Sequence, residues 1–262
     1  MAQDRETQYR CTMNLVGTPW LRVLVAAGIT ALATGIGAVP FFFMSDISRR
    51  VLGWAGAVAA GIMLAASFRL VNEGIDFSLA RSLVGLGLGV ALIALGRRTL
   101  AGHEGLEIGS LEGANAIKAL LIVGVMTVHS FAEGIGVGVS FGDRASFGFF
   151  ISFAIAIHNI PEGLAISLVL VPRGVAPWKA VLFAIVSSLP QPILAVPSYL
   201  FVEAFRPFLP VGLGIAGGAM IWMVVSELLP DAYGHAESKE RVATIAVVAV
   251  ALMMGFQVLV SA

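Results

Sequence analysis

Residues 149–171 read FFISFAIAIHNIPEGLAISLVLV, a mostly apolar run that the polar segment HNIPEG interrupts at 158–163. The run is long enough to cross a bilayer as one α-helix, because about 20 apolar residues span the hydrocarbon core. A charged side chain in the middle of such a helix costs about 2.5–3.5 kcal/mol on insertion scales. A histidine and a glutamate kept at that depth therefore point to a functional site.

The whole chain has the composition of an integral membrane protein. Of its 262 residues, 58% are hydrophobic and 12% are charged, whereas a soluble domain carries about 25% charged residues. Sixteen basic and sixteen acidic residues balance, and no basic tract indicates nucleic acid as a partner. The single cysteine, Cys11, excludes a disulfide framework and a thiolate metal cluster. The polar start, MAQDRETQYR, is unlike a cleavable signal peptide.

Hydropathy predicts an all-α protein with a single transmembrane domain over residues 1–262, a polar tail at 1–19 and eight membrane-spanning helices. The expected helices are about 20–43, 51–73, 79–96, 115–141, 145–171, 178–202, 208–229 and 242–261. Barrel strands are excluded because the apolar runs are too long and do not alternate strictly. The distribution of Lys and Arg among the loops slightly favours an N-terminus outside the membrane.

A repeat on two consecutive helices carries the chemistry. VHSFAEGIGV at 128–137 and IHNIPEGLAI at 157–166 align without a gap, so that His129 matches His158 and Glu133 matches Glu162. In each segment the His and the Glu are four residues apart and share one face of the helix. Each helix is therefore expected to present an imidazole and a carboxylate in the same direction at the middle of the membrane.

Neither helix contains a Lys or Arg in its interior to balance these acids. The carboxylates are then protonated, or face a water-filled cavity, or bind a cation. The two imidazoles favour the cation, since imidazole with carboxylate suits zinc, iron, manganese or cobalt. The alternative is that both pairs are neutral, packed residues. Pro161 adds to the site, because it frees the carbonyl of Ile157 and a freed carbonyl in a membrane needs a partner.

These motifs resemble those of the ZIP (Zrt/Irt-like) family of divalent metal transporters, in its GufA-like branch. Three further segments are similar to that family: TGIGAVP at 34–40, AAGIMLAAS at 59–67 and GGAMIWMVVSELLPDA at 217–232. The resemblance covers roughly residues 30–260 and implies an eight-helix bundle with a 3+2+3 arrangement. Helices one to three and six to eight then form an inverted repeat around helices four and five, and AGIML at 60–64 is similar to GGAMI at 217–221.

The resemblance also implies which side chains bind the metal. The implied ligands on helices four and five are His129, Glu133, His158, Asn159 and Glu162. Met63 is a candidate soft ligand on helix two, with a flexible core methionine as the alternative.

Two positions depart from the family pattern, since Ser130 stands where Asn is common and Gln191 where Glu is common. Both remain candidates at the metal site, and the lost carboxylate predicts one firmly held ion rather than two. Glu227, Glu73 and Asp231 are candidates for the pathway or its gates.

The expected function is a carrier that moves a divalent metal towards the cytoplasm by alternating access. Zinc is the expected ion, with iron, manganese, cobalt and cadmium as further candidates. The alternative is an intramembrane zinc-dependent hydrolase, although the sequence contains no HExxH segment. We expect the protein to have no enzymatic activity. Its expected partners are the lipid bilayer and the metal ion, and its expected location is a bacterial inner (plasma) membrane. The resemblance is also compatible with a homodimer.

Overall fold

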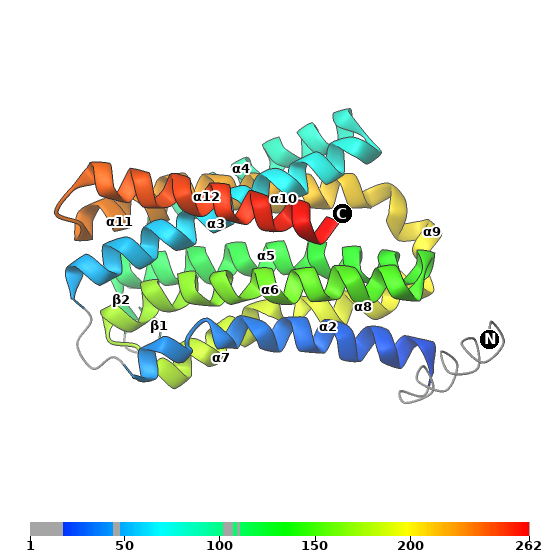
Figure 1. Ribbon diagram of the computed structural model, residues 1–262, viewed down its shortest axis with the longest axis horizontal. Helices are drawn as coiled ribbons and strands as arrows, with labels where there is room; N and C mark the ends of the chain where they lie inside the picture. The colour runs from blue at the N-terminus through cyan, green and yellow to red at the C-terminus, as the bar shows by residue number, and fades with distance from the viewer. Residues whose placement is uncertain (1–17, 44–47, 102–106, 109–110, 262) are drawn as a thin grey trace.

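In the computed structural model, described for residues 18–43, 48–101, 107–108 and 111–261, long helices run back and forth side by side (Figure 1). Eight helical segments of the described residues are long and apolar enough to cross a membrane, as the sequence predicted. The first three spans are α2 (Pro19–Ile36), α3 (Arg49–Phe77) and α4 (Leu79–Ala101). A short 3-10 turn, η1 (Val39–Phe42), follows α2, and two short paired strands, β1 (Glu107–Ile108) and β2 (Leu111–Glu112), follow α4.

The central spans are α5 (Gly113–Asp143) and α6 (Ala145–Leu170), the latter followed by the 3-10 turn η2 (Val171–Arg173). The sixth span consists of α7 (Pro177–Ser188) and α8 (Pro190–Leu200), with α9 (Val202–Phe205) and η3 (Arg206–Phe208) after it. The seventh consists of α10 (Leu209–Met223), the π-helical turn η4 (Val224–Leu228) and α11 (Leu229–His235). The eighth is α12 (Lys239–Ser261).

Several predicted boundaries were wrong because backbone and packing effects decide them. The first helix was predicted to reach residue 43 but ends at Ile36, where Gly37 approaches the backbone of α6 so closely that a Cβ would clash with it. The seventh was predicted to end at 229 but continues to His235. Its π-helical turn lies just before Pro230, which has no N–H to continue the regular hydrogen-bond ladder.

The spans pack as two bundles. We define the first bundle as α2, α5, α6, α7 and α8, and the second bundle as α3, α4, α10, η4, α11 and α12. Figure 1 shows the first bundle in the lower half and the second in the upper half. The first three spans (α2 to α4) and the last three spans (α7 to α12) each contribute one span to the first bundle and two spans to the second. This distribution fits a repeat of three spans arranged around α5 and α6.

Glycine allows the closest helix contacts in both bundles. Between α4 and α10, a Cβ at Gly89 would clash with the Ile215 backbone. Between α2 and α6, a Cβ at Gly163 would clash with the carbonyl group of Thr34. Such close approach of backbones is the usual role of small residues between membrane helices.

The bundle has two ends that differ in structure. We name them the Pro19 end, where α2 begins and α3 and α12 finish, and the His235 end, where α2, α6 and α11 finish. The Pro19 end is at the right of Figure 1 and the His235 end is at the left.

Candidate metal centre

Helices α5 and α6 bring their two His/Glu pairs together at the centre of the first bundle. The Nε2 atom of His129 lies 2.8 Å from Glu162 Oε1 and 3.3 Å from Glu133 Oε1. His158 Nε2 approaches the same Glu162 oxygen at 2.9 Å. One nitrogen or oxygen from each of the four side chains falls within a group whose members are all within 4.8 Å of one another. We refer to these four side chains as the His/Glu cluster.

The His/Glu cluster is buried but poorly hydrogen-bonded. His129 and Glu162 are fully buried, while Glu133 and His158 are 4% and 7% exposed. None of the four imidazole nitrogens makes a hydrogen bond with acceptable geometry, and neither does either oxygen of Glu162. Buried polar atoms in proteins are normally hydrogen-bonded. Converging nitrogen and oxygen atoms without such bonds are what a cation site requires.

The donor set also suits a particular class of cation. Two imidazoles with two carboxylates favour a divalent transition metal over magnesium or calcium, which prefer oxygen ligands alone. Four such ligands can surround zinc tetrahedrally. Among the residues that the structure describes, the buried charged side chains are Glu133 and Glu162, with no buried Lys or Arg. The two negative charges match one dication.

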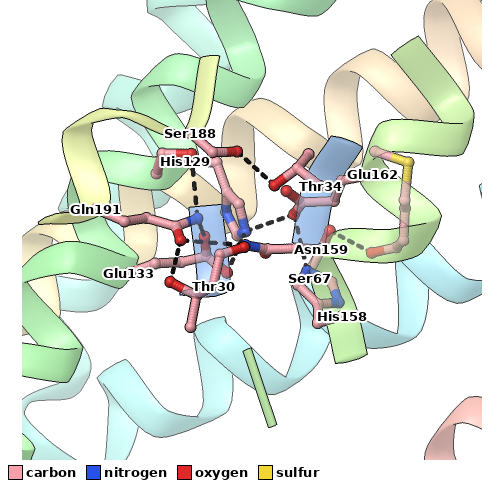
Figure 2. A network of polar contacts seen from close by, with 12 residues as sticks. Thr30, Thr34, Ser67, His129, Glu133, His158, Asn159, Glu162, Ser188 and Gln191 are labelled. Atoms are coloured by element: carbon pink, nitrogen blue, oxygen red, sulfur yellow. Dashed lines mark hydrogen bonds and ion pairs between the residues drawn. The ribbon is translucent and has the colours of Figure 1, made fainter. Parts of the chain in front are cut away.

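An ordered network of amides and hydroxyls lies beside the cluster (Figure 2). Gln191 of α8 donates from Nε2 to Glu133 Oε2 at 2.5 Å and faces Ser130 Oγ at 3.5 Å. Its Oε1 accepts from Thr30 Oγ1 at 2.5 Å and from Asn159 Nδ2 at 3.1 Å. Gln191 thus contacts the cluster directly through Glu133, and Ser130 contacts Gln191.

Asn159 keeps one atom free for a ligand. Its Nδ2 donates to the carbonyl oxygen of Thr30 at 2.7 Å as well as to Gln191, whereas its buried Oδ1 has no hydrogen-bond partner. Met63 is fully buried in α3, and its carbonyl oxygen accepts a hydrogen bond from Ser67. The roles of Asn159 and Met63 as ligands stay predictions.

A cavity of about 490 Å³ connects the cluster with the Pro19 end. His158 and Glu133 form part of its wall, and Phe77, Phe147 and Gln257 line it near the ends of their helices. Glu73, the predicted pathway acid, also lines this cavity and is paired with Arg69 at 2.8 Å. The cavity therefore reaches the cluster from this end at Glu133 and His158.

The His235 end is closed by apolar packing and ion pairs. Buried apolar side chains of both bundles, among them Met126, Leu170 and Met223, belong to one core cluster. At the end itself, Asp231 of α11 contacts Lys118 of α5 at 2.7 Å and Arg173 of η2 at 3.3 Å. These pairs join the second bundle to the first.

The remaining pathway candidate, Glu227, lies in the π-helical turn η4 and is 14% exposed at its side chain. It contacts Arg97 of α4 at 3.2 Å. Because both residues belong to the second bundle, this pair does not hold the two bundles together. The structure thus separates the three acids: Glu73 is in the cavity, Asp231 between the bundles, and Glu227 within one bundle.

Sequence reasoning missed the hydroxyl groups of α2. Thr30 and Thr34 are both fully buried, and Thr34 Oγ1 lies 2.7 Å from Ser188 Oγ of α7. The signal was a pair of threonines four residues apart on an apolar helix, which places both on one face. Threonine is common in packed membrane helices, so this signal alone does not distinguish a site from a helix interface.

Comparisons with known proteins confirm the resemblance seen in the sequence. The family described as ZIP zinc transporter matches residues 100–261. A putative zinc transporter of Arabidopsis thaliana is 47% identical over 247 residues, which cover 93% of this chain but only 39% of that longer protein. The zinc transporter GufA of Myxococcus xanthus is 32% identical over 89% of this chain and 94% of its own length.

A third relative, the zinc transporter ZIPB of Bordetella bronchiseptica, is 36% identical over 87% of this chain and 77% of its own length. All three are transporters by name, so the family is one of transporters and the hydrolase alternative is not retained. The chain belongs to the ZIP family of zinc transporters.

Proposed function

We propose that this protein carries a divalent transition metal ion, zinc in the first place, across the membrane by way of the His/Glu cluster. The observation that carries the proposal is the convergence of His129, Glu133, His158 and Glu162 in the membrane interior, where no buried Lys or Arg accompanies them among the described residues. Two buried carboxylates are costly unless a positive charge accompanies them. The names of the relatives specify zinc, which agrees with the donor set.

The short distances within the cluster make the ion and protons competitors. A carboxylate oxygen 2.8–2.9 Å from an imidazole nitrogen is a stable neighbour only if a proton or a cation lies between their lone pairs. A dication that binds must displace those protons, as in other sites with histidine and carboxylate ligands. Binding from one side and release to the other then both depend on pH.

The cavity supports a direction of transport. With the N-terminus outside, as the distribution of Lys and Arg slightly favours, the Pro19 end faces outwards and the cavity leads from outside to the cluster. Release on the cytoplasmic side requires the His235 end to open. Because ion pairs between α5, η2 and α11 close that end, opening requires the two bundles to move relative to each other.

Zinc uptake into proteoliposomes tests the proposal, with Glu162→Gln as the variant. Glutamine keeps the volume of the side chain but removes the charge that both imidazoles contact, so we expect uptake to fall at least about 100-fold, as a loss of about 3 kcal/mol implies. Glu203→Gln is the matched control because Glu203 is exposed and far from the cluster in α9. Equal uptake by the two variants would refute a role of the cluster in transport.

A further inference from the structure

The orientation of the Gln191 amide follows from one backbone carbonyl group. The carbonyl oxygen of Thr30 only accepts hydrogen bonds, so the atom of Asn159 that lies 2.7 Å from it is the amide nitrogen. That nitrogen is also 3.1 Å from the Gln191 side chain, which must therefore present its oxygen. The Thr30 hydroxyl donates to the same oxygen at 2.5 Å.

Gln191 consequently turns its nitrogen towards Glu133. One hydrogen goes to Glu133 Oε2 at 2.5 Å (Figure 2). The same nitrogen faces Ser130 Oγ at 3.5 Å. The chain of contacts from Thr30 and Asn159 through Gln191 to Glu133 is fully buried up to the carboxylate, and we refer to it as the Gln191 relay. A rotation of the amide by 180° would set two nitrogens against each other at Asn159.

The relay leaves Glu133 with one oxygen for the ion. Oε1 is directed at His129 Nε2, whereas Oε2 holds the donated hydrogen of Gln191. The N–H group that points at Oε2 occupies one of its lone pairs and hinders a cation from binding on that side of the carboxylate. We infer that Gln191 is a positioning residue that keeps Glu133 a one-sided ligand and limits the His/Glu cluster to one dication at a time.

The charge balance leads independently to the same stoichiometry. Glu133 and Glu162 are the acids among the described residues that are buried, and together they neutralise one dication. A second dication would leave a double positive charge in the membrane interior, which is strongly unfavourable. A third carboxylate at position 191 would reduce that charge and replace the donor on Glu133 Oε2 by an acceptor.

This inference rests on the proposed function, and counting bound metal separates the two. Purified protein is dialysed to equilibrium against zinc, and zinc per chain is measured for the wild type, for Gln191→Glu and for a His129→Ala/His158→Ala double variant that gives the background. We expect one ion above background for the wild type and two for Gln191→Glu. Two ions in the wild type, or one in Gln191→Glu, would overturn the inference and leave the proposed function intact. No ion above background in the wild type would instead overturn the proposed function.

A second measurement remains informative if Gln191→Glu does not fold. Thr30→Val removes the hydroxyl donor to Gln191 Oε1 while keeping the shape of the side chain, and Thr34→Val removes a hydroxyl that pairs with Ser188 outside the relay. With cobalt as the bound ion, we expect the visible absorption bands of Thr30→Val to shift from those of the wild type and those of Thr34→Val to coincide with them. Coincident spectra for all three proteins would show that the relay does not act on the ion, and the inference would fail.

Discussion

Substitution of Gly163 by alanine tests whether the contact between α2 and α6 sets the geometry of the metal centre. A Cβ at this position would lie 2.7 Å from the carbonyl carbon of Thr34 and closer still to its oxygen. The carbon contact alone requires the helices to separate by about 0.7 Å before ordinary van der Waals distances of 3.4 Å are reached, and the oxygen requires more. Since backbone atoms are involved, no side-chain rotation relieves the clash.

This separation acts on the hydrogen bond between Asn159 and Thr30, which lies one turn along the same pair of helices. Its present length of 2.7 Å would increase to at least about 3.4 Å, beyond the usual range for an N–H···O bond. Asn159, which donates to Gln191 Oε1, would then lose the contact that fixes the orientation of its amide. We expect the unfolding free energy to fall by roughly 3 kcal/mol, at the upper end for overpacked sites, and the melting temperature by about 5–10 °C.

The assay compares Gly163→Ala with Gly28→Ala, a substitution on α2 where a Cβ meets nothing within 4 Å. Thermal unfolding followed by tryptophan fluorescence gives the melting temperature, and zinc uptake into proteoliposomes gives the functional effect. Gly28→Ala should be neutral or slightly stabilising, since alanine is the better helix former. If both variants unfold at the same temperature and transport zinc equally well, the close contact does not support the site and the reasoning is refuted.

Three further predictions concern the ligands and the closed end. His158→Ala should weaken zinc binding at least about tenfold in a competition assay with a dye. His235→Ala, at the His235 end and outside the cluster, should leave the dissociation constant unchanged. Zinc affinity should fall as the pH decreases, by about tenfold per pH unit for each proton that the ion displaces, and a pH-independent dissociation constant would contradict proton competition. Asp231→Asn removes the ion pairs with Lys118 and Arg173. Amide hydrogen exchange in α11 should become roughly two- to fivefold faster, as the loss of about 0.5–1 kcal/mol implies. Unchanged exchange would show that these pairs do not hold the His235 end closed.

Hydropathy predicted the eight spans because each apolar helix must bury its backbone polar groups by itself in lipid. The interruptions within spans depend on other effects. Pro190 separates α7 from α8, because it has no N–H to continue the helix, and the sixth span was nevertheless predicted as one uninterrupted helix. The early end of α2 at Gly37 depends on a contact with α6, which lies far away in the sequence.

The candidate site, too, could be predicted from the sequence only in part. The His/Glu pairs were visible because residues four apart share a helix face, and the cost of acids in a membrane made them conspicuous. The direction in which Gln191 donates was not visible, since it depends on the carbonyl oxygen of Thr30, from a different helix. The partners of Asp231 were likewise hidden, because Lys118 and Arg173 are distant in sequence and meet it only in the folded bundle.

The distribution of ligands between the two bundles connects the fold with transport. All four residues of the His/Glu cluster belong to α5 and α6 of the first bundle, and the Gln191 relay uses α2, α5, α6 and α8 of the same bundle. The second bundle instead supplies part of the cavity wall, through Glu73 of α3 and Gln257 of α12, and the acid that closes the His235 end. Under the proposed function, a movement of one bundle against the other would thus change which end has access to the ion without changing its ligands on α5 and α6. Met63 on α3 is the sequence candidate that would contradict this separation, because a thioether ligand from the second bundle would bind the ion to both.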